Sequence, residues 1–263
     1  MILRKTAVLI LLVVAILWSA CGSKDKETVV ATYKEAEGEE AAGPALDVDV
    51  AAGAVLTGKV MFAGAKPATF PIRMDAEPVC ARIHGGPVAS QDVTLNDNGT
   101  LRYVLIYVKD GLGGKSYKPI QPKVVLDQHG CLYDPHVLGI VAGQELDITN
   151  TDDTTHNIHP IPKVNREWNE SQAKGDPKKK VFTQAEMPPI PIKCNIHPWM
   201  RSYLAVFKHP FFAVTSKDGT FEIKGLPPGS YTIEAWHEKL GTQEMKVTVS
   251  AKESKAVDFN FKG

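Results

Sequence analysis

The sequence predicts an all-β protein built from sandwiches, and three observations support this fold class. Short segments rich in β-branched and aromatic residues follow one another from residue 54 onward. Glycine and proline number 21 and 18 among 263 residues, so many turns are expected between short elements. After the N-terminal 21 residues, no segment keeps an apolar stripe at the helical period. The best helical candidate, 164–174, has no stable apolar face.

The expected strands are bounded by Gly, Pro, Asn or Asp, which favour turns over extended backbone. They cover the ranges 55–62, 101–108, 122–126, 144–149, 202–207, 211–215, 220–225, 231–236 and 244–250.

The N-terminus has the pattern of an export signal. Arg4 and Lys5 precede an apolar run over 7–18, which is shorter than the roughly 20 residues that span a membrane. Ser19, Ala20 and Cys21 follow, and the segment 1–21 resembles a bacterial lipoprotein signal with Cys21 as the lipidated first residue of the mature chain. Ordinary secretion is the alternative. Both readings place the protein in the periplasm or at the cell surface, and the first anchors it to a membrane.

Residues 22–52 are predicted to be a flexible, disordered linker. They contain three basic and eight acidic residues with few large apolar side chains, so they bury too little surface to offset the entropy of ordering. A helix over 33–42 would be marginal. The linker would hold a folded domain away from the membrane.

The overall charge and the motif content exclude two broad classes. Lys and Arg number 30 against 30 Asp and Glu, so no excess positive charge is available for binding nucleic acid. We find no nucleophile–base pair, nucleotide-binding loop or open metal site, so an enzyme is not expected.

Three cysteines remain beyond Cys21, and an odd number in an exported chain suggests either an intermolecular bridge or one thiol kept for chemistry. Cys80 and Cys131 form a disulfide in the first interpretation, as an oxidising compartment allows. In the second, they join His84 and His136 in a metal site of two Cys and two His. Sequence separation alone leaves both open.

The third cysteine begins a set of possible copper ligands. Cys194, His197 and Met200 follow one another with two residues between each pair, which places a thiolate, an imidazole and a thioether in one short loop. Copper in electron-transfer sites favours two His and one Cys in a plane with a long axial Met. His156 follows a Gly-led strand and an Asn-x-Asp turn, so it is the expected second histidine.

Both segments resemble the cupredoxins, the small blue copper proteins, over 141–159 and 190–207. The loop that begins at Cys194 is most similar to the short ligand loop of amicyanin. The resemblance implies a Greek-key sandwich over 53–207 with one type 1 copper ion. It implies that the plane is formed by His156, Cys194 and His197, and that Met200 is the axial ligand.

Two further residues are expected beside this site. The resemblance to cupredoxins implies that Asn157 ties the two ligand segments together by hydrogen bonds. His159 lies three positions after His156, so strand alternation turns it to the other face and makes it a neighbour of the site rather than a ligand.

The segment 208–263 resembles the carboxypeptidase regulatory-like domain, a small sandwich of the prealbumin (transthyretin-like) or immunoglobulin-like type. The residues that carry the resemblance lie in 213–221 and 225–231, where Asp-Gly and Pro-Gly turns follow apolar strands. The segment is short for such a sandwich, so we expect it to take residues 58–64 as a donated strand. The copper-binding part would then be an insertion.

Two functions follow from these observations. The favoured one is an exported, membrane-tethered electron carrier with transient redox protein partners, in which the edge of His197 reaches the surface between Pro198 and Trp199. The alternative is a non-redox lipoprotein sandwich for binding, scaffolding or copper storage.

Overall fold

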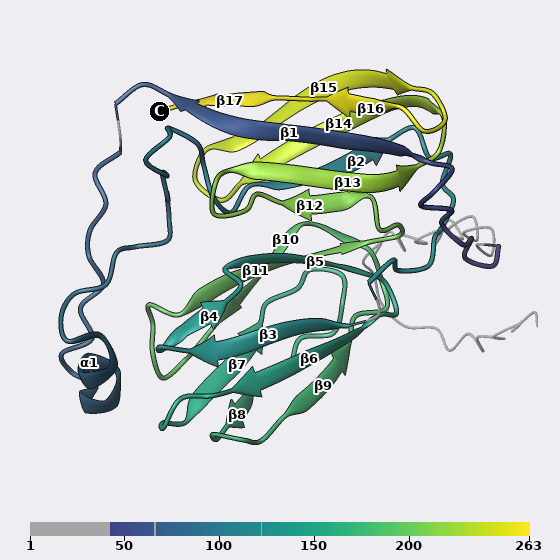
Figure 1. Ribbon diagram of the computed structural model, residues 1–263. Helices are drawn as coiled ribbons and strands as arrows, with labels where there is room; N and C mark the ends of the chain where they lie inside the picture. Colours follow the sequence, from purple (N-terminus) through teal and green to yellow (C-terminus); the bar gives the residue numbers. More distant parts are fainter. Residues whose placement is uncertain (1–42, 66, 122) are drawn as a thin grey trace, which may run out of the picture. The chain divides into compact units, whose positions relative to one another are not determined.

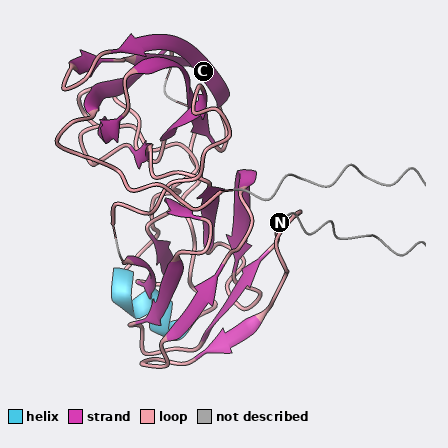
Figure 2. Ribbon diagram, turned by 90° about the vertical axis from the view of Figure 1, so that its right-hand side faces the viewer, coloured by secondary structure: helices cyan, strands magenta, loops and turns pink. Residues whose placement is uncertain are grey.

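The computed structural model describes residues 43–65, 67–121 and 123–263, and strands dominate these ranges (Figure 1; Figure 2). The all-β prediction is confirmed. The export signal, Cys21 and residues 22–42 of the predicted linker lie outside the described residues. Within the described ranges, none of the helices has the length and apolar character needed to cross a membrane.

The first sandwich, formed between residues 124 and 207, contains the predicted copper ligands. Its apolar core takes side chains from both of its sheets, among them Leu126, Ile148, Ile192 and Leu204. One sheet has the order β5 (Val137–Val141), β11 (Arg201–Phe207), β10 (Glu186–Lys193), β7 (His156–Pro160) and β8 (Glu170–Gln172). The other has the order β4 (Leu132–Asp134), β3 (Val124–His129), β6 (Glu145–Asn150) and β9 (Lys178–Val181).

The second sandwich combines the C-terminal strands with two strands from earlier in the chain. One sheet contains β13 (Thr220–Leu226), β1 (Ala54–Ala63), β16 (Ser254–Ala256) and β17 (Phe259–Lys262). The other has the order β12 (Phe212–Val214), β2 (Leu105–Asp110), β14 (Gly229–His237) and β15 (Gly241–Val249).

Strand β1 is the donated strand that the sequence predicts. It pairs antiparallel with β13 and parallel with β16 and β17. Its Gly58 passes so close to β16–β17 that a Cβ there would lie 2.0 Å from the carbonyl oxygen of Val257. Strand β2 also comes from the range 53–207 that we predicted as the copper domain, yet it pairs with β12 and β14. By strand pairing, the second sandwich is therefore larger than the predicted range 208–263.

The end of the predicted linker is packed against the folded chain. Leu46 donates its N–H to the carbonyl of Ser116 and accepts from the N–H of Lys118, at 2.9 and 2.8 Å. Val48 packs on the core of the second sandwich. The predicted range 22–52 is therefore too long at its C-terminal end. Leu46 and Val48 alternate with Asp47 and Asp49, so the prediction from charge and composition missed that this segment packs on the folded chain.

The described helix, α1 (Pro78–His84), was not expected from the sequence. It has seven residues, begins with proline and ends at Gly85 in the left-handed conformation. Cys80 is its buried residue, so no periodic apolar stripe marks it in the sequence. The range 164–174, our best helical candidate, instead contains β8, which pairs with β7.

Candidate metal centre

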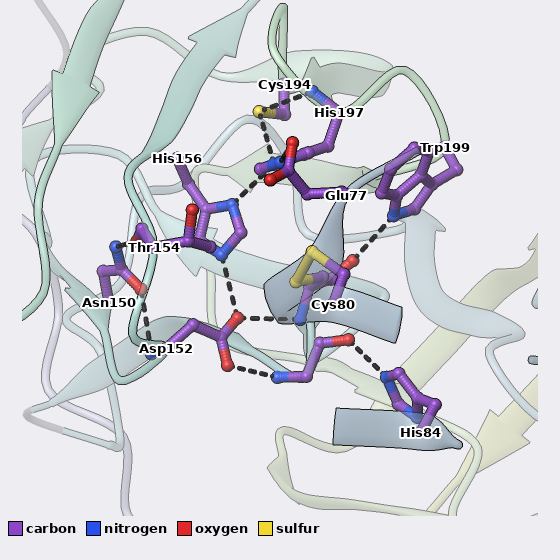
Figure 3. The surroundings of a disulfide bond; sticks show 12 residues. Glu77, Cys80, His84, Asn150, Asp152, Thr154, His156, Cys194, His197 and Trp199 are labelled. Carbon is purple, nitrogen blue, oxygen red and sulfur yellow. Dashed lines mark hydrogen bonds and ion pairs between the residues drawn. A yellow bond between two sulfur atoms is a disulfide. The ribbon is translucent and has the colours of Figure 1, made fainter. Parts of the chain in front are cut away.

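The structure brings three of the four predicted ligands together. His156 is the first residue of β7, and Cys194 and His197 lie in the loop between β10 and β11. Their potential ligand atoms lie within 4.8 Å of one another, and all three side chains are buried. The two Nδ1 atoms of the histidines are 2.8 Å apart, and Cys194 Sγ is 3.8 Å from Nδ1 of His197 (Figure 3).

The ligand loop folds back on itself, which explains the spacing of its residues. Cys194 donates its N–H to the carbonyl of Met200 at 3.2 Å, and Met200 donates its own to the carbonyl of His197 at 2.9 Å. The N–H of His197 donates to Cys194 Sγ at 3.3 Å. Met200, the predicted axial ligand, is fully buried in the core of the first sandwich at the end of this loop.

Asn157 links the two ligand segments in the way that the resemblance implied. Its N–H donates to Cys194 Sγ at 3.3 Å, and its side-chain oxygen accepts the N–H of Asn195 at 3.0 Å. Its amide nitrogen donates to the side-chain oxygen of Asn169. The side chain therefore fixes β7 against the ligand loop.

His159 makes polar contacts on both sides of its ring. Its Nδ1 is 3.1 Å from the side-chain oxygen of Asn195, and its Nε2 is 2.7 Å from a carboxylate oxygen of Glu167. It therefore contacts the ligand loop through Asn195, and its place as a neighbour of a metal site stays a prediction.

Asp152, a buried carboxylate in the predicted Asn-x-Asp turn, holds His156. Asp152 Oδ2 lies 2.8 Å from Nε2 of His156 and accepts the N–H of Cys131 at 2.7 Å. Its Oδ1 accepts the N–H of Gly130 at 2.7 Å. A carboxylate on Nε2 fixes the proton there, so Nδ1 presents its lone pair to the site. The Asn-x-Asp pattern marked this residue, but its partner was not visible in the sequence.

Electrostatics favour a thiolate at Cys194. Burial raises its pKa, but contacts with His156 and the N–H groups of His197 and Asn157 outweigh this effect, and the net shift is downward. Burial lowers the pKa of His156, but Asp152 and Cys194 outweigh it, and the net shift is upward. The pKa of His197 is lowered by burial and by His156.

His197 is not at the surface, so the prediction of an exposed histidine edge is wrong. Its exposed fraction is 1%, and the Trp199 ring lies 5.2 Å from its own. Among the described residues its buried Nε2 has no hydrogen-bond partner, and Oε2 of Glu77 is 3.5 Å away. Glu77 directly precedes α1, so the residue that lies against the imidazole comes from a part of the sequence far from the ligand loop.

The donor set fits a copper ion. A thiolate and two imidazole nitrogens converge in one buried place, with a thioether at the end of the same loop. Asp152 holds the proton of His156 on the far nitrogen. A metal on Nδ1 of His197 would likewise leave its proton on Nε2, the nitrogen that faces Glu77.

The second metal site that we considered is contradicted. Cys80 and Cys131 are joined in a disulfide, the first of our two interpretations, so neither thiol is available. His84 donates to a backbone carbonyl at 2.6 Å, and His136 is paired with the carboxylate of Glu238. The free cysteine of the described residues is Cys194.

Comparison with known proteins matches part of the chain. A search of curated proteins finds no match. Among solved structures, a purple cupredoxin from Nitrosopumilus maritimus is 23% identical over 32% of this chain and 98% of its own, with a TM-score of 0.28. A Cu(I) form of an amicyanin mutant is 22% identical over 34% of this chain and 86% of its own, with a TM-score of 0.29. A copper-containing nitrite reductase from Thermus scotoductus SA-01 is 22% identical over 36%, with a TM-score of 0.30, and the match spans only 24% of its length. Cupredoxins are therefore among the structures to which this chain is similar, and residues 208–262 match the family model of the carboxypeptidase regulatory-like domain.

Proposed function

We propose that this protein is an exported blue copper protein that carries single electrons between protein partners. The observation that carries the proposal is the convergence of His156, Cys194 and His197 at one buried point. A copper ion bound there would supply a one-electron couple at a potential set by these donors. The disulfide suits an oxidising compartment, and a lipid on Cys21 would tether the protein to a membrane.

The residues around the donors keep them in one arrangement. Asp152 orients His156, and two backbone N–H groups point at the sulfur of Cys194. Such support limits rearrangement between oxidation states and excludes water, because each of the four proposed ligands is at most 2% exposed.

The same burial supports a carrier rather than an enzyme. A substrate needs direct access to a catalytic centre, whereas an electron passes through protein to a docked partner. On the ligand loop, Ile196 is 47% exposed and Pro198 is exposed. These apolar residues suit the weak, transient docking of a redox partner.

Visible spectroscopy of the copper-loaded protein tests the proposal. We expect an intense absorption band from charge transfer between the Cys194 thiolate and Cu(II). Cys194→Ser should remove the band and leave the sandwich folded, because the thiolate is the chromophore. His129→Gln is the matched control, since this histidine is exposed and its ring bonds to the hydroxyl of Thr151 at the surface.

Two results would contradict the electron carrier. A Cys194→Ser variant with an unchanged spectrum would remove the cysteine from the site. A wild-type protein that binds copper without strong colour would favour the non-redox alternative, a copper store or scaffold.

A further inference from the structure

The outer nitrogen of His197 faces a carboxylate from a distant segment. Nε2 is buried without a hydrogen-bond partner in the described part of the chain, and Oε2 of Glu77 lies 3.5 Å from it. This distance is longer than a hydrogen bond. With a metal on Nδ1 the ring proton would lie on Nε2, and Glu77 is placed to accept it in a hydrogen bond.

The backbone of Glu77 is held so that its side chain is free for this contact. Its N–H donates to the carbonyl of Met74, and its own carbonyl accepts the N–H of Ala81, both at 2.9 Å. Glu77 occupies the position before the first turn of α1, yet its side chain makes no capping hydrogen bond. The carboxylate is therefore not committed to a capping hydrogen bond.

The disulfide connects the two carboxylates that face the histidines. Cys80 lies in the first turn of α1, three positions after Glu77, and is bonded to Cys131. The N–H of Cys131 donates to Asp152, which holds His156. Figure 3 shows Asp152 against His156 and Glu77 against His197, with the disulfide between them. One covalent link thus places both acceptors.

We propose that Glu77 is a positioning residue that also sets the reduction potential of the site. When a metal occupies Nδ1 of His197, Glu77 accepts a hydrogen bond from the Nε2–H, as Asp152 does from His156, and so turns Nδ1 toward Cys194. Its negative charge stabilises Cu(II) more than Cu(I), because the higher positive charge gains more from a nearby anion. This inference rests on the proposed copper function and adds a residue to it.

Reduction potential and copper affinity of the full protein test the proposal. Glu77→Gln keeps a side-chain oxygen and removes the charge, so the potential should rise while the affinity for Cu(I) changes less than tenfold. A tenfold change in the ratio of Cu(II) to Cu(I) affinity corresponds to 59 mV for a one-electron couple, and we expect a rise of about this size. Glu77→Ala also removes the acceptor, and copper affinity should fall by about 10- to 100-fold.

Asp75→Asn is the matched control. It removes the same charge from the same segment, but Asp75 is 73% exposed and 3.9 Å from Arg73, so solvent screens it. Its potential and affinity should equal those of the wild type.

The outcomes separate this inference from the proposed function. A strongly coloured wild type whose potential is unchanged in both Glu77 variants overturns the role of Glu77 and leaves the carrier intact. Equal shifts in Glu77→Gln and Asp75→Asn also overturn it, because a general charge effect would explain them. A wild type that forms no coloured copper site overturns the proposed function, and the role of Glu77 fails with it.

Discussion

Removing the Cys80–Cys131 disulfide should destabilise the protein by an amount that its position in the chain determines. In the chain-entropy description, closing a loop of n residues removes about 2.1 + 1.5R ln n cal/mol/K from the unfolded chain. The cysteines are 51 positions apart. At 25 °C the cross-link should therefore stabilise the folded protein by about 4 kcal/mol.

The perturbation is the double variant Cys80→Ala, Cys131→Ala. Both cysteines are fully buried, so alanine avoids introducing a buried hydroxyl. Urea unfolding followed by tryptophan fluorescence measures the free energy of unfolding. Cys194→Ala is the control, because it removes a buried thiol without opening a loop, and we expect it to lower the unfolding free energy by about 1 kcal/mol.

Copper affinity provides a second measurement on the same variant. The bond connects α1 to the residue that donates to Asp152, so the variant should also bind copper more weakly than the wild type. A loss of unfolding free energy below about 1 kcal/mol would refute the loop-closure argument. An unchanged copper affinity would show that Glu77 stays against His197 without the disulfide.

Two further predictions concern buried groups. Burial lowers the pKa of His209 and of His237 to about 4. Because the unfolded chain takes these protons near pH 6.5, stability is fully present above that pH and is lost as pH falls toward 4, by about 2 kcal/mol per histidine between pH 7 and pH 5. His209→Asn keeps an acceptor for the N–H of Phe211 and should remove the contribution of that histidine, about half of the loss. Urea unfolding at pH 7 and pH 5 measures this difference. An unchanged pH dependence would contradict the lowered pKa of His209. For the proposed axial ligand, Met200→Leu should leave copper bound and raise the reduction potential, whereas Met200→Gln should lower it, because a harder oxygen donor favours Cu(II). Equal potentials in voltammetry of the three proteins would remove Met200 from the site.

The proposed ligands could be singled out in the sequence because each lies in a short local pattern. Cys194, His197 and Met200 share one loop, and His156 follows a recognisable turn. Asp152 and Glu77 could not be assigned roles, since their partners come from other elements. The exposed edge predicted for His197 failed for the same reason: nothing in the ligand loop indicates that Glu77 lies against it.

The strands could be predicted where a run of apolar and β-branched residues also has an extended backbone. The range 101–108 reads as one strand, but Tyr103 has a φ of 62°, which interrupts extended backbone, and β2 begins at Leu105. Strand β10 escaped prediction because Pro188 and Pro189 lack the N–H that a sheet requires. They lie where its register with β11 shifts, between Glu186 and Ile190.

The central place of β1 has a consequence for biosynthesis. All of its sheet partners, β13, β16 and β17, follow it by most of the length of the chain. While the ribosome makes residues 64 to 219, β1 lacks all three strand partners and has the bridge between Met61 and Thr100 at its C-terminal end. A largely unpaired apolar strand is a template for aggregation. The first sandwich contains its own strands and can close within that interval. The nascent chain therefore depends on keeping β1 apart from other chains until its partners emerge. Loss of residues 254–262 would leave the edge of β1 opposite β13 permanently unpaired.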